Sequence, residues 1–146
     1  MAITYNQILT AVYNHLNAAL TARGQNFNAL TEGMNDTPAF QVYPESMDPA
    51  SSDSGTQTFT LRSGVIQETH VIHVDYYARQ RSHLGEDMAA LVVGLDAICT
   101  SLEAAGCPPF GLAGIKSFQW SWSRVLFDYG GVAYVGVRFV LRLRTF

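Results

Sequence analysis

Residues 132–145 read Val-Ala-Tyr-Val-Gly-Val-Arg-Phe-Val-Leu-Arg-Leu-Arg-Thr, and this stretch decides the fold. One set of alternate positions is apolar, while Arg138, Arg142 and Arg144 lie in the other set. Such alternation is typical of a β-strand with one buried face. The segment 115–128 alternates in a similar way, and paired glycines between the two segments tolerate the positive φ of a tight turn. The sequence therefore predicts a long hairpin here.

The first helix is predicted over residues 4–22, where apolar side chains recur at every fourth position. Thr4 and Gln7 have the spacing of a capping box at its start. Gly24 is the predicted stop, because glycine readily takes the left-handed conformation that ends many helices. One face of this helix must pack against another element.

The strongest helical pattern covers residues 82–105, with Ser82 as the predicted N-cap and Gly106 after the end. Its apolar positions recur at alternating spacings of four and three, which predicts a helix lying on a sheet. These positions are Leu84, Met88, Leu91, Leu95, Ile98 and Leu102.

Three further strands are predicted, over residues 38–44, 57–62 and 65–79. In the last of them His73 and Asp75 face away from the apolar positions. The sum is an α+β fold: a mainly antiparallel sheet of about four to five strands, two helices packed on one side, and the long C-terminal hairpin.

We expect residues 1–146 to form a single domain, because this length suits one hydrophobic core. Residues 44–56 are rich in Ser, Asp and Pro, which cannot bury apolar area, so we expect a mobile surface loop there. Hydrophobic residues make up 48% of the chain and charged ones only 14%, against about 25% in a typical soluble domain. That composition excludes a disordered chain and indicates that a partner covers part of the surface.

The charge is unevenly distributed along the chain. Residues 115–146 carry a net charge of +4, residues 1–114 carry −7, and the whole chain carries −3. The acidic total argues against a protein that grips nucleic acid. A basic, aromatic end on an acidic body suits head-to-tail association of copies. The alternative is a set of strand charges that simply face solvent or pair with neighbouring strands.

The chain is expected to be assembled in the cytoplasm, because it begins with no basic and apolar signal segment. Its longest charge-free apolar stretch, residues 88–95, is far shorter than the ~18–20 residues that span a bilayer. Cys99 and Cys107 are the two cysteines. Two cysteines in an unexported chain are expected to be free thiols, and they are too few for a metal cage.

The sequence predicts no enzyme, and no catalytic, cofactor-binding or metal-binding residue. His70 and His73 are three positions apart on a strand, so they leave opposite faces and cannot share a metal ion. Asp75 and His73 share a face, but no nucleophile accompanies them. Cys99 fits a packed helix position better than a nucleophile. An alternative is a small-ligand-binding α+β domain whose Trp120–Trp122 strand lines a pocket.

The order of parts resembles one group of proteins over essentially the whole chain. A short helix leads to the proline-bracketed strand Pro38-Ala-Phe-Gln-Val-Tyr, and an acidic loop follows. A long strand then ends in His73-Val-Asp-Tyr-Tyr-Ala, before an amphipathic helix and the C-terminal hairpin. This order and character of elements, though without a signature motif, is similar to that of the tail terminator (tail completion) proteins of long-tailed bacteriophages.

The resemblance implies a structural protein of the virion, located in the tail and neck. Such proteins form a homohexamer ring on the head-proximal end of the tail tube, stop tube polymerisation and join the tail to the neck and head. The implied partners are further copies, the tail tube protein and a neck or head-completion protein. DNA would pass through the ring without sequence-specific binding, and no membrane partner is expected. Another neck, head-completion or connector protein of the virion is the nearer alternative.

Within such a ring, we expect four charged residues of the sheet to make subunit contacts, and three acidic residues of the loop to reach a tube or neck neighbour. The ring contacts are Asp75, Arg138, Arg142 and Arg144, and the loop contacts are Glu45, Asp48 and Asp53.

Overall fold

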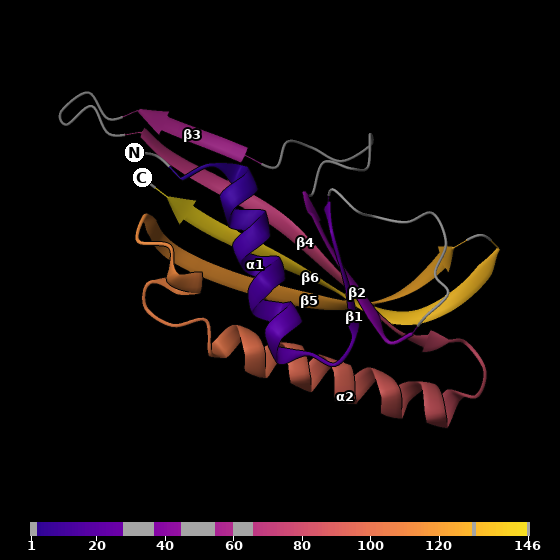
Figure 1. The fold of residues 1–146 in the computed structure, drawn as a ribbon. Coiled ribbons are helices and arrows are strands. Elements are labelled where there is room, and N and C mark those ends of the chain that lie inside the picture. Colours follow the sequence, from indigo (N-terminus) through magenta and orange to yellow (C-terminus); the bar gives the residue numbers. More distant parts are fainter. Residues whose placement is uncertain (1–2, 28–36, 45–54, 60–65, 130, 146) are drawn as a thin grey trace.

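The computed structural model describes residues 3–27, 37–44, 55–59, 66–129 and 131–145 (Figure 1). Most of the loop predicted over residues 44–56, with its three acidic contact residues, lies outside the described residues. The elements run in the following order: α1 (Tyr5–Ala19), β1 (Arg23–Asn26), β2 (Ala39–Pro44), β3 (Gly55–Phe59), β4 (Ile66–Gln80), α2 (Leu84–Glu103), a short 3₁₀ turn η3 (Pro109–Gly111), β5 (Ile115–Tyr129) and β6 (Val132–Thr145).

The strands of the described residues form one sheet in the order β1-β2-β4-β6-β5, with β3 beside the start of β4. Strand β1 runs parallel to β2, and the remaining pairs are antiparallel. Helices α1 and α2 pack on one face of this sheet (Figure 1). The predicted α+β fold with its long C-terminal hairpin is therefore confirmed.

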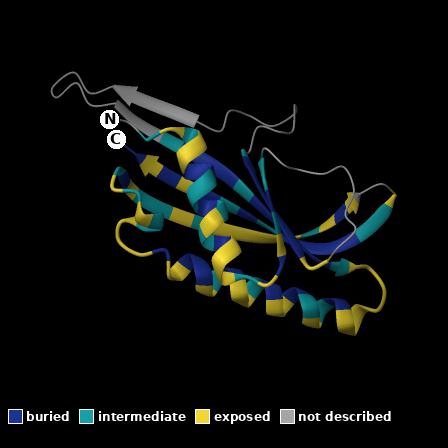
Figure 2. Ribbon diagram, in the orientation of Figure 1, coloured by how far each residue is buried: buried dark blue, intermediate teal, exposed yellow. Residues whose placement is uncertain are grey.

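The main core lies between the helices and the sheet. The side chains of β4 and β6 alternate as predicted, so that one set from each strand is sealed under α1 and α2. Figure 2 shows buried residues along much of the described part of β4 and β6, whereas β5 and the outer side of α2 carry more exposed residues. The largest fully buried side chains are Ile8, Val12, Leu16, Phe40, Val42, Ile72, Val74, Ile98, Leu102, Phe139, Leu141 and Leu143.

The first helix begins as the sequence predicts and ends earlier. Thr4 and Gln7 form the capping box, each side chain bonding the other residue's backbone N–H. The helix stops at Ala19, and Gly24 lies in β1 instead of ending the helix. A Cβ on Gly24 would lie 2.6 Å from the Phe40 ring, so this position of the sheet accepts only glycine without a shift.

The second helix also departs from the prediction at its start. His83, not Ser82, is the N-cap residue of α2, and its side chain makes no capping bond. Leu84, predicted to lie in the buried stripe, is 78% exposed because the first turn borders an open cleft. Farther along, Gly94 allows α2 to approach the sheet closely, since a Cβ there would lie 2.0 Å from the Tyr76 ring. In the described residues, neither helix has the length and apolar character needed to cross a membrane.

Candidate functional site

The face of the sheet that points away from the helices carries a buried ionic network. Strand pairing sets Asp75 of β4 opposite Arg138 of β6. The Arg138 Nε donates to Asp75 Oδ1 at 2.8 Å, and Nη2 donates to Oδ2 at 3.1 Å. The Tyr43 hydroxyl of β2 donates to Asp75 and accepts from Arg138 Nη2 at 3.1 Å. Three strands are thus joined by one carboxylate that is 2% exposed.

The electrostatics of this network favour the charged pair and a protonated tyrosine. Burial, reinforced by the adjacent Asp75 carboxylate, raises the pKa of Tyr43 well above its usual range. The hydrogen bond that Arg138 donates to the Asp75 carboxylate raises the pKa of Arg138 above its usual value. The guanidinium also lies 5.7 Å from the centre of the Phe127 ring, where an arginine gains from the ring's negative face. The network is therefore satisfied within one chain.

A second set of polar side chains continues this layer toward the β1 edge. The Gln41 amide donates to Gln25 Oε1 at 2.9 Å, and the Tyr77 hydroxyl donates to Gln41 Oε1 at 3.0 Å. All three residues are buried. In β1, β2 and β4, hydrogen bonds among polar side chains thus accompany burial of the face away from the helices, whereas apolar side chains bury the helix-covered face.

The four residues predicted to make ring contacts share this face, but they differ in accessibility. Arg142 and Arg144 follow Arg138 at alternate positions of β6, and both are exposed. Asp75 and Arg138 bind one another inside the chain, so Asp75 can influence a neighbouring copy only through Arg138. The ring-contact role remains a prediction, and Arg142 and Arg144 are the residues placed to make it directly.

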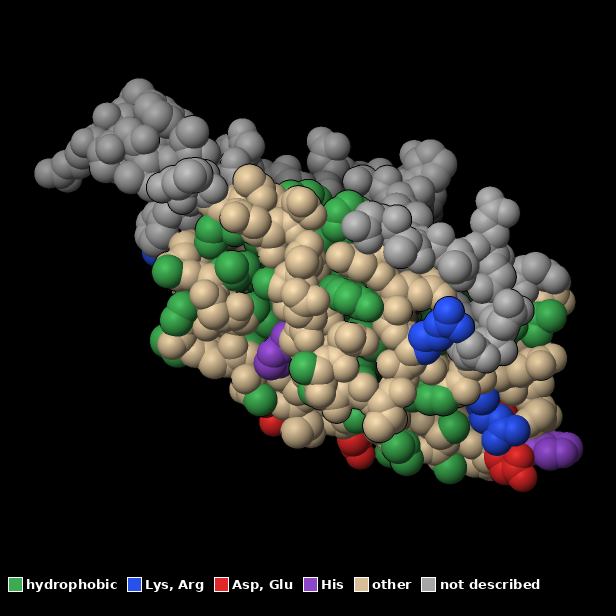
Figure 3. Space-filling view, in the orientation of Figure 1, with side chains coloured by type: hydrophobic (Ala, Val, Ile, Leu, Met, Phe, Trp, Pro, Cys, Tyr) green, Lys and Arg blue, Asp and Glu red, His purple; other side chains and the backbone are tan. Residues whose placement is uncertain are grey.

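The opposite side of the molecule is acidic. Helix α2 contains four carboxylates and no lysine or arginine. Glu86, Asp96 and Glu103 are exposed, and Figure 3 shows acidic side chains following this helix. Because α2 covers one face of the sheet and the exposed arginines of β6 project from the other, opposite charges lie on opposite sides of the subunit.

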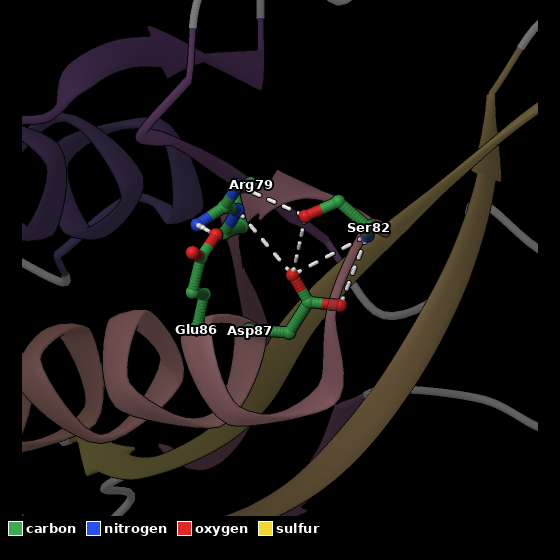
Figure 4. Close-up of polar contacts among 4 residues, drawn as sticks. All are labelled: Arg79, Ser82, Glu86 and Asp87. Atoms are coloured by element: carbon green, nitrogen blue, oxygen red, sulfur yellow. Dashed lines mark hydrogen bonds and ion pairs between the residues drawn. The ribbon is translucent and has the colours of Figure 1, made fainter.

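The turn from β4 into α2 is held by a polar cluster that the sequence did not predict (Figure 4). Asp87, which is 4% exposed, accepts a hydrogen bond from the Ser82 backbone N–H at 3.0 Å and lies 3.3 Å from Arg79 Nε. Glu86 lies 3.3 Å from Arg79 Nη1. These contacts orient the start of α2.

A cleft of about 380 Å³ separates the first turn of α2 from β5 and β6. Arg81, Met88, Arg124 and Leu126 contribute to its walls. Neither tryptophan of β5 lines it, although Arg124, Val125 and Leu126 of the same strand do. Ser82 and Asp87, which hold the start of α2, also line the cleft.

The candidate chemical residues of the sequence are separated in space. His70 points toward α1, with its ring 5.0 Å from that of Tyr5, and His73 leaves the other face beside Tyr43. Burial, with smaller contributions from Glu103 and Asp96, raises the pKa of the Cys99 thiol and disfavours the reactive thiolate. Within the described residues, no group of three or more His, Cys, Asp or Glu side chains could hold a metal ion.

The sequence reasoning identified Asp75 and Arg138 but missed Tyr43, Gln41 and Gln25. A signal existed for two of them: Gln41 and Tyr43 alternate with Phe40 and Val42, so they had to leave the face opposite the core. No protein-family model matches this chain, and no curated protein matches it.

Proposed function

We propose that this chain is a structural subunit of a bacteriophage tail, a tail terminator protein whose copies form a ring on the head-proximal end of the tail tube. The ring would stop tube polymerisation and present its other end to the neck of the head. The observation that supports this role is the separation of charge between the acidic helix α2 and the exposed arginines of β6.

A ring requires head-to-tail contacts, in which two different surfaces of the subunit meet. A subunit with an acidic surface on one side and a basic surface on the other meets this requirement, because unlike patches on successive copies attract and like patches repel. The pair Asp75–Arg138 would hold β6 in register beneath this contact. The chain's net charge of −3 also suits a ring that lets DNA pass without gripping it.

The test reverses the charge of the basic surface. Arg142→Glu combined with Arg144→Glu is expected to abolish the ring, whose mass by native mass spectrometry would be six times 16.0 kDa. Arg81→Glu, an exposed arginine at the end of β4, is the control that should leave the ring intact. Adding Asp96→Arg and Glu103→Arg on α2 should restore it. A ring that tolerates the double arginine reversal would contradict the proposal.

The same variants test the biological role. In a phage whose own copy of the gene is removed, the wild-type chain and the Arg81→Glu control should restore tails of normal length joined to heads. The double arginine variant should give separate heads and overlong tubes. Normal tails without any functional copy of the chain would overturn the proposed role and favour a different neck or head protein.

A further inference from the structure

Strand β5 leaves one edge of the sheet open. It is the last strand of the sheet, spans fifteen residues and, in the described part of the chain, pairs only with β6. The opposite edge is formed in part by β1, which has four residues. Native proteins usually protect their edge strands by keeping them short, by bulges, by charged side chains or by covering them, because free N–H and C=O groups pair with other strands.

The middle of β5 has little of this protection. Its register is irregular only between Ile115 and Ser117, and no proline occurs in the strand. Residues 121–124 are exposed at four consecutive positions, so neither face is covered there. Trp122 is 52% exposed and Leu126 is 56% exposed, both on the helix-covered side of the sheet, since they pair with Phe139 and Val135. Two large apolar side chains exposed at an open edge indicate an interaction surface.

The sequence of β5 is complementary to itself when read in the opposite direction. In an antiparallel pair of two β5 strands centred on Trp122, the even-numbered residues from 118 to 126 face side chains of compatible chemistry. The facing pairs are Trp122 with Trp122, Trp120 with Arg124, and Phe118 with Leu126. Aromatic pairs, apolar pairs and a cation facing an aromatic ring each stabilise cross-strand contacts.

Neighbouring registers lose this match. Moving the centre to Ser121 sets Phe118 opposite Arg124, and moving it to Ser123 sets Phe118 opposite Asp128. Both shifts keep the faces aligned but lose the apolar pair of Phe118 and Leu126. We infer that the free edge of β5 binds the β5 edge of a second copy of this chain, antiparallel and centred on Trp122, to form one sheet continuous across two subunits.

This contact is isologous, since the same strand serves both copies. It is distinct from the head-to-tail contacts of the proposed ring, which join two different surfaces, and it does not rest on that proposal. The two inferences can therefore fail separately.

Cysteine cross-linking tests the register directly. In a background of Cys99→Ala and Cys107→Ser, Trp122→Cys places two thiols on facing residues, whose Cα atoms in an antiparallel pair lie about 4.5–5.5 Å apart. That separation lies within the range of disulfides. The matched control is Gln119→Cys, also exposed, whose two copies would lie about 20 Å apart along the strand.

We expect the Trp122→Cys protein to form a covalent dimer under mild oxidation at least ~10-fold faster than the Gln119→Cys protein, because only the former satisfies disulfide geometry. Gln119→Cys mixed with Val125→Cys should form a mixed dimer, since these positions face one another in the same register. Equal rates for the two single variants, or a wild-type chain that stays monomeric at ~100 μM in a sedimentation experiment, would overturn the inference.

Two outcomes separate this inference from the proposed function. A six-membered ring in which Trp122→Cys does not cross-link would overturn the β5 contact and leave the ring proposal standing. Rapid Trp122→Cys cross-linking together with normal phage tails from the arginine-reversal variant would support the β5 contact and contradict the proposed ring.

Discussion

The two faces of the sheet bury their central strands by different means. On the helix-covered face, Phe139 and Val74 are sealed by hydrocarbon from α1 and α2. On the other face, Asp75 and Arg138 sit on the same two strands and are sealed by hydrogen bonds with Tyr43. Apolar burial stabilises in proportion to area, whereas a buried ion pair stabilises only while every partner is present.

That difference indicates different tasks. The apolar face holds the chain together, and the ionic network fixes which residues of β2, β4 and β6 stand opposite one another. A fixed register matters on this face because it also positions the exposed arginines of β6. Substitutions on each face should therefore differ in how much stability they remove.

Phe139→Ala removes a fully buried ring from the helix-covered face. The expected loss in the free energy of unfolding is about 3–5 kcal/mol, from lost burial and the cavity that remains. Val140→Ala, the next residue and only half-buried on the other face, should cost about 1 kcal/mol or less. Urea unfolding followed by circular dichroism measures both. Equal losses would mean that the two faces contribute alike.

Asp75→Asn removes the charge that Arg138 and Tyr43 share. We expect a loss of about 2–4 kcal/mol, because the half-buried Arg138 loses its charged partner and one of the two acceptor oxygens becomes a donor. The triple variant Tyr43→Phe, Asp75→Leu, Arg138→Met replaces the whole network with hydrocarbon and should recover more than half of that loss. A triple variant as unstable as the single one would show that the face requires its charges for stability itself.

Tyr43→Phe weakens the dependence of stability on alkaline pH. An unfolded tyrosine ionises above a pH of about 10, while burial and Asp75 raise the pKa of Tyr43 in the folded protein, so the stability that this residue contributes is lost as the pH rises above 10. The wild type should lose up to about 1.4 kcal/mol more per pH unit there than Tyr43→Phe.

Tyr76 on the helix-covered face gives the matching measurement for pH. Burial alone raises the pKa of Tyr76, so Tyr76→Phe should also flatten the alkaline loss. Urea midpoints at pH 9, 10 and 11 compare the three proteins. Identical pH profiles for the wild type and Tyr43→Phe would contradict the protonated state assigned to the network.

Trp122→Ser is expected to have the smallest effect on the stability of the subunit. The side chain is half exposed at the open edge, so the free energy of unfolding of the isolated subunit should change by no more than about 0.5 kcal/mol. Association through β5 should fall strongly in the same variant, as measured by sedimentation. A large loss of subunit stability would mean that the Trp122 indole is part of the core.

The sequence predicted the elements whose pattern is regular. The apolar alternation of β6, the regular apolar spacing of α2 and the capping box at Thr4 all match the structure, because each depends on the local pattern of one element. Strand β1 was missed, since its three polar residues and one glycine show no apolar alternation and its pairing depends on β2, thirteen residues farther on. Leu84 was misplaced because only the tertiary arrangement shows where α2 overhangs the sheet.

The candidate site was predictable in its charges and not in its pairings. Alternation alone sets Arg138, Arg142 and Arg144 on one face. It does not show that Asp75 and Arg138 stand opposite one another, because that register is set by the pairing of β4 with β6, which are not consecutive in the chain. The partner of the pair, Tyr43, comes from a third strand, so no local pattern could reveal it.

Gold labelling of a tagged copy of this chain in purified phage particles would show whether the chain occupies one place in the virion. We expect labels at the junction of head and tail, with six copies per particle. Complete, infectious particles that carry no copy of the chain would contradict it.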